Sequence, residues 1–102
     1  MSGAFLGFFN VRDEIERFQP GADSSGRRAE TLIKTDGLRV VLVTMRTGIS
    51  LNEHTAPGPI TIHALSGRFQ VTFEDQHRAL GPGDIVSLAG GVRHAIGIDQ
   101  PK

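Results

Sequence analysis

Two stretches that each begin at a glycine constrain the fold of this chain more than any other feature of its sequence. The first runs from Gly48 to Gly67 and carries His54, and the second runs from Gly83 to Ile98 and carries His94. Short apolar runs alternate with turn residues throughout this region, at spacings of roughly 8 to 12 residues, which is typical of an all-β barrel or sandwich. We therefore expect a small antiparallel β-barrel with both histidines pointing into its mouth.

Composition limits the kinds of partner that this chain can bind. The 102 residues suffice for one domain with a single core. Because 11 basic residues are balanced by 11 acidic ones, no positive field would attract nucleic acid or a membrane surface. Cysteine is absent, which excludes disulfides, thiolate ligands and cysteine nucleophiles. We expect a small-molecule ligand, no nucleic acid and no membrane.

A short helix is predicted after the apolar N-terminus. Val11, Ile15 and Phe18 are spaced four and three apart, which puts them on one helical face. Asn10 is a suitable N-cap, and Pro20 followed by glycine ends the helix. The preceding residues lack the basic region of a signal peptide and are too few to span a membrane, so we expect a cytoplasmic protein.

Residues 1–29 are predicted to form an aromatic segment, a short helix and a loop that packs on the barrel or on a partner. Residues 30–102 are predicted to form the barrel itself. The sequence ends shortly after Ile98, which would leave an open strand edge, and an uncovered edge invites pairing with another strand. We therefore expect a homodimer.

The first strand pair is predicted on either side of Thr35-Asp36-Gly37. Asp-Gly favours a hairpin because both residues tolerate positive φ. The run Leu38 to Met45 is nearly continuous in apolar character, as in a strand that is covered on both faces.

The glycines and histidines of both stretches resemble the two motifs of the cupin superfamily, G-x5-H-x-H-x3-4-E-x6-G and G-x5-P-x-G-x2-H-x3-N. The resemblance covers about residues 30–98 and implies an RmlC-like jelly roll. Ala56 and Ile60 replace the second histidine and the glutamate of the first motif, and Ala89 and Ile98 replace the proline and the asparagine of the second. The positions that match are Gly48, His54, Gly67, Gly83, Gly91 and His94.

Cupins with both motifs intact bind a divalent metal through three histidines and the glutamate. The resemblance therefore implies a degenerate site in which His54 and His94 remain as ligands of a divalent ion such as Mn, Fe, Ni or Zn. His63 is the candidate for a substitute third ligand. Strand alternation points Ile60 and Ile62 into the barrel and His63 out of it, unless a bulge near Pro57 reverses this order.

Three functions are compatible with these residues. The first is small-molecule binding in the barrel cavity, with Ile60 and Ile62 as apolar lining and Arg93 as a clamp for a carboxylate. The second is a metal-dependent oxygenase or isomerase that uses His54, His94 and a third ligand. The third is a structural or interaction protein without catalysis. Whether the chain is an enzyme stays open at this point.

Overall fold

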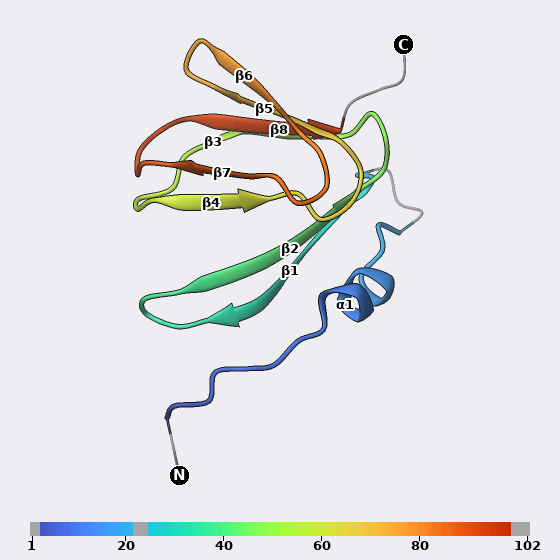
Figure 1. Cartoon of the computed structure of the whole chain (residues 1–102), viewed down its shortest axis with the longest axis vertical. Coiled ribbons are helices and arrows are strands. Elements are labelled where there is room, and N and C mark those ends of the chain that lie inside the picture. Colours follow the sequence, from blue (N-terminus) through green and yellow to red (C-terminus); the bar gives the residue numbers. More distant parts are fainter. Residues whose placement is uncertain (1–2, 22–24, 99–102) are drawn as a thin grey trace. The chain divides into compact units, whose positions relative to one another are not determined.

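The structure is a computed structural model that describes residues 3–21 and 25–98, except for the side chains of Asn52 and Ile98. Residues 22–24 of the predicted loop and the last four residues lie outside this part. The chain separates into two compact units, Met1–Arg46 and Thr47–Lys102. In chain order the elements are α1 (Val11–Arg17), β1 (Arg27–Lys34), β2 (Arg39–Met45), β3 (Ser50–His54), β4 (Ile60–His63), β5 (Phe69–Phe73), β6 (Gln76–Leu80), β7 (Ile85–Leu88) and β8 (His94–Ile98) (Figure 1).

The boundary between these two compact units falls after β2. The division of the chain at residue 29 into an N-terminal segment and a barrel stays a prediction. The hairpin of β1 and β2 forms a two-stranded sheet of its own, so it groups with the helix. Packing of residues 1–29 on the barrel or on a partner stays a prediction.

Helix α1 begins and ends as its sequence predicts. The Asn10 side chain accepts a hydrogen bond from the amide of Asp13 at 3.1 Å, which satisfies one of the free N–H groups of the first turn. The amide of Phe18 closes the last turn on the carbonyl of Glu14 at 3.0 Å. Within the described ranges, no helix has the length and apolar character needed to cross a membrane.

The β1–β2 hairpin turns at the predicted residues but by another mechanism. Neither Asp36 nor Gly37 has a positive φ. The hydroxyl of Thr35 instead accepts hydrogen bonds from the amides of Gly37 at 3.3 Å and Leu38 at 3.0 Å, and the Thr35 amide donates to the Leu38 carbonyl at 2.7 Å. The side chain that begins the turn therefore organises it, as in other turns that Ser and Thr stabilise.

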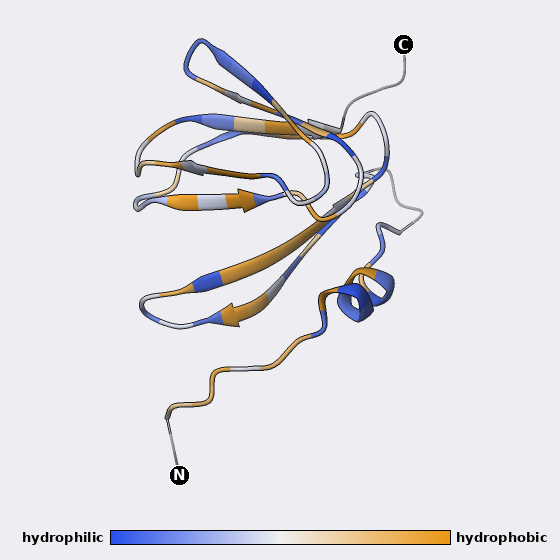
Figure 2. Ribbon diagram, in the orientation of Figure 1, coloured by the Kyte–Doolittle hydropathy of each residue, from blue (hydrophilic) through white to orange (hydrophobic). Residues whose placement is uncertain are grey.

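The expectation that the second strand is covered on both faces is wrong over its first half. Val40 and Val41 are 36% and 40% exposed, whereas Leu42 is 7% exposed. The N-terminal segment is largely hydrophobic in Figure 2. It adds further exposed apolar residues, with Phe5 at 77% and Phe8 at 84%. The homodimer stays a prediction.

The second unit is built from two antiparallel sheets. One has the strand order β3-β8-β5-β6, and the other pairs β4 with β7. Val71 on β5 is fully buried and forms the core with Ala64 and Leu80, and Ile62 on β4 and Val86 on β7 pack against this cluster. The two sheets of this unit therefore pack against each other through their apolar faces.

Left-handed turns connect the strands where the sequence has its framework glycines. Gly67, before β5, has φ of 78°, and Gly83, before β7, has φ of 91°. Side chains with a Cβ rarely adopt this backbone conformation, which explains glycine at these positions. The last two strands, Ile85–Leu88 and His94–Ile98, both lie within the second stretch that the sequence analysis singled out, Gly83 to Ile98.

Candidate functional site

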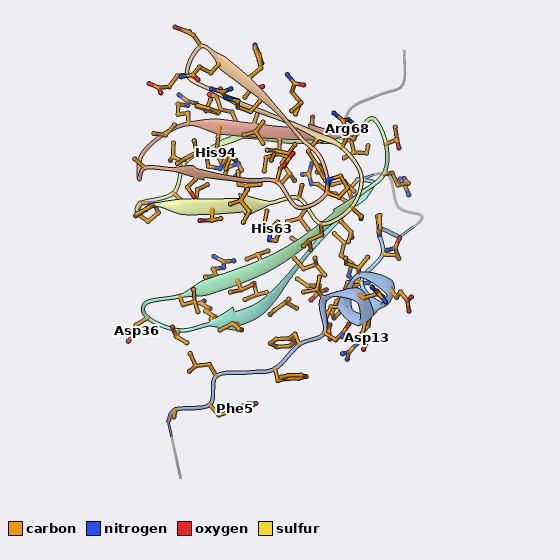
Figure 3. The ribbon with its side chains drawn as sticks, viewed as in Figure 1. Phe5, Asp13, Asp36, His63, Arg68 and His94 are labelled. Atoms are coloured by element: carbon orange, nitrogen blue, oxygen red, sulfur yellow. The ribbon has the colours of Figure 1, made fainter. Side chains whose placement is uncertain are left out.

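His54 and His94 lie directly opposite each other on neighbouring strands of the four-stranded sheet. Their Cα atoms are register partners between β3 and β8. The centroids of the two imidazole rings are 4.1 Å apart, and the rings meet edge to face at 62°. Two residues that are 40 positions apart in the sequence therefore form one polar pair. Figure 3 labels His94, the member of the pair on β8.

An irregularity in β3 makes this pairing possible. Leu51 pairs with Ile96 and His54 pairs with His94, so three residues of β3 span the same distance as two residues of β8. In a regular strand Leu51 and His54 would point to opposite faces, because side chains alternate with a period of two. The extra residue turns His54 toward the face that carries Leu51 and Ile96.

The orientation of the His94 ring is fixed by the backbone. His94 is 2% exposed, and its Nδ1 lies 3.1 Å from the carbonyl oxygen of Val92. A carbonyl oxygen accepts only, so Nδ1 carries the hydrogen of this bond. In the neutral ring the lone pair is then on Nε2, which can accept a hydrogen bond or coordinate an ion.

The loops that precede β4 and β8 cross at close range. The Gly91 amide donates to the carbonyl of Ala56 at 2.8 Å. A Cβ at Gly90 would lie 2.6 Å from the carbonyl oxygen of Pro57 and 3.0 Å from the Cα of Gly58. This crossing ties together the segments that directly follow His54 and directly precede His94.

Register partners across the sheet define which other side chains share the face of the histidine pair, because directly opposed residues point the same way. Beyond His94, the next two strands contribute Phe73 and then Gln76. The neighbouring row contains Ile96, then Val71, then Arg78. We call this the inner face of the four-stranded sheet, since it is the side on which Val71 is buried. The ten inner-face positions whose side chains the structure describes are Leu51, His54, Phe69, Val71, Phe73, Gln76, Arg78, Leu80, His94 and Ile96.

The inner face changes from apolar to polar along the strands. Leu80 is 5% exposed and belongs to the core. Toward the other end of the strands, His54, Gln76 and Arg78 are exposed, while Phe73 between them is half-buried. The polar end of this face can therefore be reached from solvent.

His63 lies apart from the histidine pair. On β4 the burial alternates, so Ile60 and Ile62 are half-buried and Thr61 and His63 are exposed. The register partner of His63 is Ile85, which is 57% exposed. His63 is therefore on the outer face of the β4–β7 pair.

The two isoleucines proposed as ligand lining have different surroundings. Ile62 packs against the core cluster, so its side chain already contributes to folding. Ile60 is half-buried and pairs with Leu88, which is 7% exposed.

Arg93 does not extend toward the inner face. Its Nε atom is 2.7 Å from the Oε1 of Glu53, and both side chains are largely exposed, at 72% and 55%. Glu53 and Arg93 flank the histidine pair on the opposite side of the same two strands. The Nε atom of Arg93 is therefore paired with a carboxylate of the protein itself.

The residues present do not reproduce the metal site that the fold family implies. The first motif supplies only His54, because Ala56 and Ile60 carry no donor atom. No group of three or more His, Cys, Asp or Glu side chains suited to a metal ion occurs among the described residues. Catalytic sites for zinc usually present three protein ligands, so the donor set falls short of that requirement.

Two polar positions of the inner face, Gln76 and Arg78, were missed in the sequence analysis. Strand alternation could have identified them, since Leu80 is apolar and the side chains at 76, 78 and 80 share one face. No comparable sequence pattern indicated the extra residue between Leu51 and His54 in β3.

Comparisons with known proteins agree on the fold. No family model matches the sequence, and no curated protein is significantly similar to it. A solved cupin superfamily protein from Desulfitobacterium hafniense matches with a TM-score of 0.71 and 26% identity, covering 76% of this chain and 72% of that one. KdgF from Halomonas sp. matches with a TM-score of 0.67 and 23% identity, covering 79% and 75%.

A cupin-2 domain protein from Shewanella frigidimarina matches over more of the chain, with a TM-score of 0.71, 17% identity and coverage of 90% and 84%. Together with the antiparallel sheets and the single short helix, these similarities confirm the predicted fold class. The chain therefore has the fold of the cupin superfamily, a small antiparallel β jelly roll with a short N-terminal helix.

Proposed function

We propose that this protein binds a small organic molecule at the polar end of the inner face, with His54 and His94 as its central polar contacts. The observation that carries the proposal is the histidine pair itself, with ring centroids 4.1 Å apart on directly opposed residues. Binding sites for small molecules combine apolar walls with a few converging polar groups. Phe73 and Ile96 supply apolar surface beside the pair, and both are half-buried.

The two imidazoles suit a ligand with hydroxyl or N–H groups. The Nδ1–H of His94 is committed to the carbonyl of Val92, so Nε2 of the neutral ring is left as an acceptor. His54 is exposed and offers a second imidazole from the opposing strand. An acceptor of fixed orientation beside a second ring can distinguish ligands by the position of one donor group.

The test follows the imidazole nitrogens by ¹⁵N NMR while defined metabolite-sized compounds are added. The panel contains linear dicarboxylates of four to eight carbons and the diols of equal length. We expect at least one compound to shift the ring resonances of His54 and His94 together, since the rings are in contact. His77 is the matched control, because it is exposed and bonds to Thr72 through Nδ1 at 3.2 Å on the outer face of the sheet. Equal shifts in all three rings, or no shift in the pair, would contradict the proposal.

The proposed role does not require a metal, and this leads to a separate expectation. Two imidazoles without a carboxylate hold a divalent ion weakly compared with the usual three or four ligands. Protein purified without an affinity tag is expected to contain far less than one equivalent of Mn, Fe, Ni or Zn by elemental analysis. A stoichiometric ion that disappears in both His54→Ala and His94→Ala would instead favour the oxygenase or isomerase alternative.

A further inference from the structure

Arg78 presents a guanidinium on the inner face of the four-stranded sheet. Its register partner is Val71, which is fully buried, so both residues start from the same face. Arg78 itself is exposed, because β6 is the last strand of the sheet. Gln76 is two residues away on the same strand and therefore on the same face.

No acidic side chain of the described residues forms an ion pair with Arg78, and the nearest in sequence, Glu74 and Asp75, belong to the turn between β5 and β6. None of the ten inner-face positions is acidic. The facing sheet contributes Ile60, Ile62, Val86 and Leu88 to the side that is packed inward. Among the described residues, Arg78 and Gln76 have no side-chain hydrogen bond or ion pair. Among the ten described inner-face positions, Arg78 is thus the side chain that always carries a charge, and the others are apolar or can be neutral.

The distance between Arg78 and the histidine pair suits a single small molecule. Two inter-strand steps separate His94 from Gln76, which corresponds to roughly 10 Å between their backbones. Arg78 lies one row further along the sheet, and its side chain can reach back across part of this distance. Phe73 lies between the two polar groups and offers an apolar contact.

We propose that Arg78 binds the carboxylate of an organic acid whose other end contacts His54 and His94. This inference rests on the proposed function and specifies the class of its ligand. The planar guanidinium offers paired N–H donors that match the two oxygens of a carboxylate, and such charge-assisted pairs are stronger than neutral hydrogen bonds. The amide of Gln76 can donate a further hydrogen bond to the same group.

An edge strand offers a competing explanation for Arg78. Inward-pointing charges on edge strands hinder pairing with other molecules, and this alone could account for an arginine on β6. The two roles, ligand binding and edge protection, predict different effects of replacing Arg78. A ligand contact affects affinity for acids, whereas edge protection affects self-association.

The experiment measures binding of the linear dicarboxylates and of the equally long diols to the wild-type chain, Arg78→Ala, Arg78→Lys and Arg68→Ala. Arg68 is the matched control, because it is exposed, lies next to the same strand pair and precedes the inward-pointing Phe69. We expect acids to bind more tightly than diols, and Arg78→Ala to weaken acid binding by about tenfold. Arg78→Lys should lose about threefold, since it keeps the charge and loses the paired geometry. Arg68→Ala should bind as the wild type does.

Each outcome separates this inference from the proposed function. Equal binding of acids and diols with shifted His54 and His94 resonances, unchanged in Arg78→Ala, would overturn the inference and leave the proposed function standing. Increased self-association of Arg78→Ala with unchanged acid affinity would assign Arg78 to edge protection and overturn it too. If no compound moves the histidine resonances, both fail.

Discussion

Replacing Leu80 with alanine is expected to lower the free energy of unfolding by about 3 kcal/mol. Leu80 is 5% exposed and belongs to the core cluster of the second unit, together with Ala64 and Val71. The substitution removes apolar contacts and leaves a cavity that the opposing strands can only partly close. For a chain of this size the change corresponds to a fall of roughly 10–20 °C in the melting temperature.

The matched control for this prediction is Leu65→Ala. Leu65 is 37% exposed and lies in the segment between β4 and β5, so the same truncation should cost less than about 1 kcal/mol. Denaturant-induced unfolding, followed by far-ultraviolet circular dichroism, measures both values. Similar losses in the two variants would show that Leu80 does not have the central role in packing that its burial indicates.

Local rules were sufficient to predict most of the fold. The helix depends on Asn10, a capping residue whose side chain bonds to the first turn, and this interaction involves residues three apart. The strands from β4 to β8 depend on alternation and on turns at glycines such as Gly67 and Gly83, whose positive φ excludes most other residues. These signals act over a few residues, so they can be read from the sequence.

The candidate site depends on longer-range order that no local rule specifies. His54 and His94 meet because β3 contains an extra residue relative to β8, and such a shift is decided by pairing between distant strands. The same is true of Arg93, whose neighbour Glu53 is 40 residues away in the sequence. The sequence alone did not indicate that Arg93 pairs with Glu53 across the strands, and its role as a clamp for a ligand stays a prediction.

The burial of an apolar strand is also hard to predict from the sequence. Leu38 to Met45 reads as a buried strand, yet Val40 and Val41 are substantially exposed in the isolated chain. The sequence shows that a residue is apolar, but it does not show which other residues pack against it.

The second large effect is expected from Gly90→Ala, because this glycine lies where two loops cross. The new Cβ would be 2.6 Å from the carbonyl oxygen of Pro57 and 3.0 Å from the Cα of Gly58. Both neighbours are backbone atoms, so the contact can be relieved only by moving a loop. We expect a loss of about 2–3 kcal/mol in the free energy of unfolding, which is typical of overpacking.

Gly90→Ala should also disturb the candidate site, since the crossing joins the segments that follow His54 and precede His94. Separation of the loops would break the hydrogen bond from Gly91 to Ala56 and increase the distance between the imidazoles. We expect the ring ¹⁵N resonances of both histidines to move in the folded variant, while those of His77 stay in place. Gly58→Ala is the control from the opposite loop, because a Cβ there meets nothing within 4 Å. If Gly90→Ala is as stable as Gly58→Ala and leaves the histidine resonances unchanged, the crossing does not hold the pair together, and the positions of His54 and His94 depend on strand pairing alone.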